Sequence, residues 1–93
     1  MPEVIFHIRW PDGVEEQYYS PSTIIRQHLI AGESYPLDEF VARARAGLIE
    51  ASDRVALKYG FACSSAMDQL ARIEATARRY HQDDAPVTCL SLQ

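Results

Sequence analysis

One stretch of the sequence combines residue types that can do chemistry. In Y-G-F-A-C-S-S, residues 59–65, a thiol and two hydroxyls stand just before a predicted helix. Unpaired N–H groups and the helix dipole favour negative charge at a helix N-terminus, so Cys63 could form a thiolate there and an anion or oxyanion could bind beside it. Arg54, in the preceding predicted helix, could reach a ligand near that helix's end. The candidate ligand-binding residues are therefore Arg54, Tyr59, Cys63, Ser64 and Ser65, and Cys63 is the candidate catalytic residue.

The same stretch also has a structural interpretation. Cysteine often serves as a small buried hydrophobe, and serines at a helix start often cap it. A nucleophilic cysteine normally needs a base, and the three candidates, His7, His28 and His81, have no signature spacing. Of the two interpretations, the residues favour the structural one.

Composition and charge narrow the classes of function. The sequence has no C-x-x-C or H-x-x-x-H pair and no cofactor fingerprint, so we predict no metal and no cofactor. The net charge is −4 and the basic residues are mixed with acidic ones, which makes nucleic acid an unexpected partner. The N-terminus lacks signal-peptide features, and no apolar run approaches membrane-spanning length. We therefore expect a cytoplasmic protein without membrane association.

The two cysteines, Cys63 and Cys89, should be free thiols, although one bridge between them is compatible with the sequence.

The N-terminal third predicts a hairpin. Residues 3–10 alternate with the period of a half-buried strand, with Val4, Phe6, Ile8 and Trp10 on one face. Trp10-Pro11-Asp12-Gly13 fits a type I turn. If Trp10 pairs with Val14, the register places Phe6 opposite Tyr18, Ile8 opposite Glu16 and Arg9 opposite Glu15.

The rest of the chain predicts three helices and a strand. Ser20-Pro21 is typical of a helix start, and the short helix it begins should stop by Gly32. The longest apolar stripe runs from Leu37 to Tyr59 and is followed by Gly60 as C-cap. Within it Gly47 costs about 1 kcal/mol relative to alanine, which implies close approach of another backbone or a slight bend. A third helix should begin at Ser64 or Ser65, where Ser65 and Asp68 have capping-box spacing, and run through Tyr80. Residues 87–92 read as a strand that joins the hairpin.

These elements predict an α+β fold. The order is ββαααβ, a three-stranded sheet of the N-terminal hairpin and the C-terminal strand with helices packed on one face, in a single domain over residues 1–93. A chain this short buries only about 60–65% of its unfolded surface, so a homodimer would help its stability.

Several motifs together resemble a known family. They are R-W-P-D-G near the start, Y-S-P-S at 19–22, G-x-x-Y-x-L-x-x-F from Gly32 to Phe40, and above all K-Y-G-F-A-C-S-S-A. This combination looks like the small bacterial nitrogen starvation response proteins, and the resemblance covers nearly the full chain. It implies a gene cluster with a nitrilase, a radical-SAM protein, a flavoprotein oxidoreductase and an acetyltransferase, linked to the use of nitriles or cyanide as nitrogen. It implies no catalytic residue.

Three functions follow as hypotheses. The first is an accessory or partner-binding protein that serves the nitrilase-linked pathway, with the cluster's enzymes as partners. The second is a small thiol-dependent enzyme or carrier, in which Cys63 reacts and the N–H groups after it stabilise negative charge. The third is a sensing module that holds a small anion at the same helix start.

Overall fold

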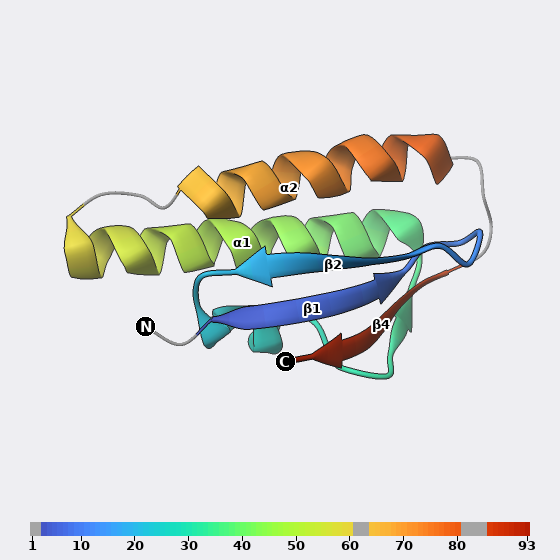
Figure 1. The fold of residues 1–93 in the computed structure, drawn as a ribbon, viewed down its shortest axis with the longest axis horizontal. Coiled ribbons are helices and arrows are strands. Elements are labelled where there is room, and N and C mark those ends of the chain that lie inside the picture. The colour runs from blue at the N-terminus through green and yellow to red at the C-terminus, as the bar shows by residue number, and fades with distance from the viewer. Residues whose placement is uncertain (1–2, 61–63, 81–85) are drawn as a thin grey trace.

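The computed structural model describes residues 3–60, 64–80 and 86–93 as two layers, an antiparallel sheet and a pair of α-helices packed on one of its faces (Figure 1). In chain order the elements are β1 (Val4–Arg9), β2 (Glu15–Ser20), the 3₁₀ helix η1 (Thr23–Gln27), β3 (Ser34–Tyr35), α1 (Leu37–Tyr59), α2 (Ser64–Ala77), the 3₁₀ turn η2 (Arg78–Tyr80) and β4 (Val87–Leu92). The predicted α+β class is confirmed. The predicted three strands and three helices are wrong in number, since the described residues form four strands and two α-helices.

The first two strands form the hairpin that the turn residues predict. The Trp10 N–H donates to the Val14 carbonyl (2.8 Å), the Gly13 N–H donates to the Trp10 carbonyl (2.9 Å), and Gly13 has a φ of +93°. The predicted register is confirmed at all three pairs: Phe6 with Tyr18, Ile8 with Glu16 and Arg9 with Glu15. Strand alternation then turns the predicted apolar face toward the helices, and none of its four side chains is more than 1% exposed: Val4, Phe6, Ile8 and Trp10.

The last strand joins this hairpin as predicted. β4 pairs antiparallel with β1, with a register shift between His7 and Ile8. The additional strand, β3, pairs with the other side of β4, so the sheet order is β2-β1-β4-β3. Sequence pattern misses β3 because two residues cannot show an alternation. Backbone bonds outside the strand support it: the Gly32 N–H donates to the Cys89 carbonyl (2.7 Å), and the Cys89 N–H donates to the Glu33 carbonyl (2.9 Å).

The segment after β2 is a 3₁₀ helix, which corrects the prediction of a short α-helix capped by Ser20. Its N-cap is Ser22, whose Oγ accepts from the Ile24 N–H at 3.3 Å. The Ser20 hydroxyl donates to the Ser22 carbonyl (2.8 Å) and so supports the cap. Five residues are too few to sustain an α-helix. Ile24 and Ile25 are buried and hold this turn in place.

The two α-helices cover the sheet in antiparallel directions (Figure 1). α1 ends where the sequence predicts, because Gly60 adopts a left-handed φ of +84° and its N–H donates to the Ala56 carbonyl (2.8 Å). α2 lies over β2, where the Gln69 Oε1 accepts from the Tyr19 N–H (3.0 Å) and the Arg72 guanidinium lies 5.2 Å from the Tyr18 ring centre. An outward N–H of this edge strand is therefore satisfied by a helix side chain.

An aromatic cluster joins the two layers. Trp10 meets Phe40 of α1 and Tyr18 of β2 edge to face, at 5.6 Å and 6.4 Å between ring centres. It stacks on Tyr80 of η2 at 5.6 Å, with 16° between the rings. The Tyr80 hydroxyl donates to Asp12 Oδ2 (2.8 Å), which ties the end of the helix layer to the hairpin turn.

Gly47 is explained by close packing. It is buried and faces η1, and a Cβ added there would overlap Ile25 Cδ1 and lie 3.3 Å from His28 Cδ2. The expected close approach of another backbone is therefore wrong, because the atoms nearest to Gly47 belong to the side chains of Ile25 and His28. Glycine at this position lets η1 pack directly against α1.

We expect Gly47→Ala to lower the free energy of unfolding by about 1 kcal/mol, measured by urea denaturation. Alanine gains about 1 kcal/mol of helix propensity, but overpacking costs about 1–3 kcal/mol. The control is the same change in an Ile25→Val background, which removes the overlapping Cδ1. There Gly47→Ala should be neutral or stabilising, and an equal loss in both backgrounds would contradict this explanation.

Candidate functional site

The predicted site lies where α1 ends and α2 begins. Tyr59 is the last residue of α1 and Ser64 the first of α2, so both lie at the same end of the helix layer (Figure 1). The predicted start of this helix at Ser64 or Ser65 is confirmed, and Ser65 is its second residue and not its N-cap. The candidate thiol, Cys63, lies outside the described residues. In the sequence it directly precedes the 14 residues of α2.

The last two turns of α1 carry a large exposed apolar side chain, Leu57, and two cations, Arg54 and Lys58. Leu57 is 88% exposed and Tyr59 is 48% exposed. The Lys58 ammonium lies 5.6 Å from the Tyr59 ring centre. Arg54 is also exposed, but helical spacing separates it from Tyr59 by about 140° around the axis. Arg54 lies two turns after Gly47, on the side of α1 that faces η1.

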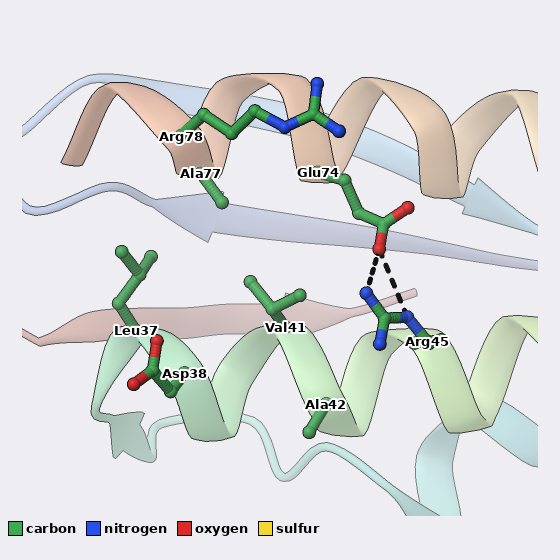
Figure 2. Close-up of a pocket in the computed structure, with 8 residues that line it drawn as sticks. All are labelled: Leu37, Asp38, Val41, Ala42, Arg45, Glu74, Ala77 and Arg78. Carbon is green, nitrogen blue, oxygen red and sulfur yellow. Dashed lines mark hydrogen bonds and ion pairs between the residues drawn. The ribbon is translucent and has the colours of Figure 1, made fainter. Parts of the chain in front are cut away.

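A separate groove lies between the first half of α1 and the end of α2. It has a volume of about 320 Å³, and Figure 2 shows the residues that line it: Leu37, Asp38, Val41, Ala42, Arg45, Glu74, Ala77 and Arg78. Leu37 and Val41 pack against the core and supply an apolar floor. Arg45 crosses the groove and donates to Glu74, with an Nε to Oε2 distance of 3.1 Å. The groove is therefore amphipathic, with an apolar floor and charged side chains along it. None of the predicted site residues lines this groove.

Two charged residues of α1, Arg43 and Glu50, hold the neighbouring segment in place. Arg43 donates to Glu39 (3.0 Å) and to the His28 carbonyl (3.1 Å), and its guanidinium lies 4.7 Å from the Tyr35 ring centre. Glu50 pairs with His28 Nε2 at 3.0 Å. Only the spacing of Glu39 and Arg43, four residues apart on a helix, could have indicated part of this arrangement.

The core contains a buried polar cluster. The Tyr18 hydroxyl donates to Glu16 Oε2 (2.7 Å), and burial together with this bond raises the pKa of Tyr18 to about 12. Among the described residues the buried Trp10 indole N–H has no hydrogen-bond partner. At the turn, the Val14 N–H donates to Asp12 (3.0 Å) and holds the pKa of that carboxyl below its usual range. Burial raises the pKa of Tyr80, the other partner of Asp12.

The second cysteine is part of the core. Cys89 is a free thiol with no exposed surface, and burial raises its pKa to about 11. A thiolate is therefore strongly disfavoured there at neutral pH. Any thiol chemistry of the native protein would have to come from Cys63.

The described segments contain neither a cluster of metal ligands nor a helix that could span a membrane. No three histidine, cysteine, aspartate or glutamate side chains in those segments come together as a metal would require. Neither described α-helix combines the length and apolar character needed to cross a bilayer.

Fold and surface together define a small two-layer α+β protein with an exposed helix pair and an amphipathic groove. The chain belongs to the family of nitrogen starvation-induced proteins NitG, whose family model matches residues 5–92. The nitrogen starvation resemblance of the sequence motifs is thereby confirmed. No curated protein and no solved structure matches the chain.

Burial of Cys89 predicts a loss of stability at alkaline pH. The unfolded thiol ionises near its usual pKa of 9.0 and the folded one only near 11. Between these values the native state binds more protons than the unfolded state, so the free energy of unfolding falls as pH rises. Two pKa units correspond to about 2–3 kcal/mol. Urea denaturation at pH 8, 9.5 and 10.5 measures the fall.

The control for this prediction is Cys89→Ala. Because folding also raises the pKa of Tyr18, the free energy of unfolding falls for this second reason from about pH 10 upward. The variant should keep that fall but lose the part between pH 9 and 10. Parallel curves for wild type and variant would show that Cys89 does not cause the decline.

Proposed function

We propose that the chain is an accessory protein of the nitrogen starvation response, which binds a partner protein in the cytoplasm and catalyses no reaction itself. Membership of the nitrogen starvation-induced family supports the physiological setting. As partners we propose the enzymes of the nitrilase gene cluster that the sequence motifs imply.

The observation that carries this proposal is the exposure of Leu57. Its 88% exposed side chain lies at the end of α1, next to Lys58 and within the same two turns as Arg54. Fully burying a leucine side chain is worth about 1.5–3 kcal/mol, so a partner with an apolar pocket at this point would bind with that additional free energy. Arginine is enriched at interface hot spots, and Arg54, three residues before the leucine, lies on the same side of α1.

The charges of this surface specify the partner's chemistry. Although the whole chain has a net charge of −4, the last turns of α1 carry Arg54 and Lys58, opposed there by Asp53 alone. A complementary partner presents an apolar pocket rimmed by carboxylates. Such charges would speed association and favour this partner over basic ones.

We expect Leu57→Asp to weaken binding to the cognate enzyme at least tenfold. The substitution removes the apolar anchor and brings a carboxylate toward an acidic rim. Biolayer interferometry with each purified cluster enzyme measures the dissociation constant. Val14→Asp is the matched control, because Val14 is also an exposed apolar residue, 47% exposed, at the hairpin turn. Absence of association with every cluster enzyme would reject the proposal.

The competing proposal is a thiol-dependent enzyme or carrier. The start of α2 at Ser64 supports it, because a cysteine directly before a 14-residue helix is favoured as a thiolate. A sensor for a small anion would use the same N–H groups. Both assign a role to Cys63 that partner binding does not need.

Alkylation of Cys63 separates these functions. In a Cys89→Ala background, partner binding predicts a thiol with a pKa near the model value of about 8.5 and full function of Cys63→Ala. A reactive thiol with a pKa below about 7, measured from the pH dependence of iodoacetamide labelling, would favour the enzyme or carrier. Thermal stabilisation by a small anion such as phosphate or cyanide, without turnover, would favour the sensor.

A further inference from the structure

β2 is the long edge strand of the sheet in the described part of the chain. The strand order is β2-β1-β4-β3, with β2 as the outer neighbour of β1 (Figure 1), and the opposite edge strand, β3, has only two residues. An edge strand carries backbone N–H and C=O groups that can bond to a further strand. Six residues are an ordinary strand length, so β2 is long enough for another strand to pair with it.

The hairpin register shows which backbone groups of β2 point away from the sheet. The Trp10 N–H donates to the Val14 carbonyl (2.8 Å), so these two residues form a hydrogen-bonded pair. The register runs from this pair along the hairpin without a shift, and hydrogen-bonded pairs occur at every second position of an antiparallel ladder. The residues whose N–H and C=O groups point outward are therefore the three intervening ones: Glu15, Gln17 and Tyr19.

A helix side chain occupies this edge at one of those residues. Gln69 of α2 accepts the Tyr19 N–H through its Oε1 atom at 3.0 Å. The Arg72 Nη1 donates to the same Oε1 at 3.4 Å, and the Arg72 guanidinium lies 5.2 Å from the Tyr18 ring centre. Arg72 therefore supports the Gln69 side chain in its position at the edge.

A second copy of β2 can pair antiparallel with this edge in only a few registers, because outward groups must meet outward groups. Registers near the start of the strand place Glu15 opposite Glu15 or Glu16 opposite Glu16, and like charges directly opposite each other are destabilising. The register centred on Gln17 has no such pair. It places Glu15 opposite Tyr19, so the Tyr19 N–H has to act as a donor there, and registers nearer the end of β2 use the same N–H.

We propose that Gln69 guards the edge of β2 against pairing with a second copy of the chain. The charges of Glu15 and Glu16 disfavour the registers at the start of the strand, and Gln69 occupies the donor that the remaining registers need. The contact is autoinhibitory, because it keeps a strand-pairing surface closed within the folded chain. This role is independent of partner binding at Leu57, which lies near the end of α1.

Removal of the acceptor tests the guard. Because alanine favours a helix, Gln69→Ala should retain α2. In dilute protein its Tyr19 amide should exchange at least tenfold faster than in wild type, measured by NMR. In sedimentation equilibrium at about 500 μM, its mean mass should exceed that of wild type. Gln69→Glu keeps an acceptor oxygen and should behave as wild type. Gln27→Ala, at an exposed glutamine of η1, is the matched control and should change neither measurement.

A proline at Gln17 identifies the surface through which the variant associates. Because the Gln17 N–H points outward, Gln17→Pro removes an edge donor and no bond to β1, and edge strands tolerate proline at such a position. Added to Gln69→Ala, it should restore the mean mass of wild type. Circular dichroism establishes that each variant is folded. A mean mass of Gln69→Ala equal to that of wild type would overturn the proposal, as would an increase that persists with Gln17→Pro.

Discussion

The burial of Trp10 is the constraint on which the rest of the structure depends. It is the largest fully buried side chain, and its ring contacts come from β2, α1 and η2. Each aromatic contact of this kind stabilises the fold by about 0.5–1.5 kcal/mol beyond the burial of area. These contacts offset the cost of burying the Trp10 indole N–H, which has no hydrogen-bond partner among the described residues. Because Tyr80 also bonds to Asp12 in the hairpin turn, the end of the helix layer is fixed relative to the sheet. That attachment sets the distance between the start of α1 and the end of α2, and so the groove between them.

Local signals were sufficient for the parts of the fold that depend on neighbouring residues. The alternation around Phe6, the turn at Pro11–Gly13 and the left-handed Gly60 each specify backbone geometry within a few positions, and all three agree with the structure. η1 and β3 could not be predicted in the same way. η1 packs through Ile25 against Gly47 of α1, and β3 is defined by its pairing with β4. Both depend on contacts between segments distant in sequence.

The two candidate surfaces also differ in how far local sequence could predict them. Residue chemistry alone proposed the stretch from Tyr59 to Ser65 as a site, and only the predicted helix start within it is confirmed, by the start of α2 at Ser64. The pairing of Arg45 with Glu74 joins residues 29 positions apart and depends on which faces of the two helices meet.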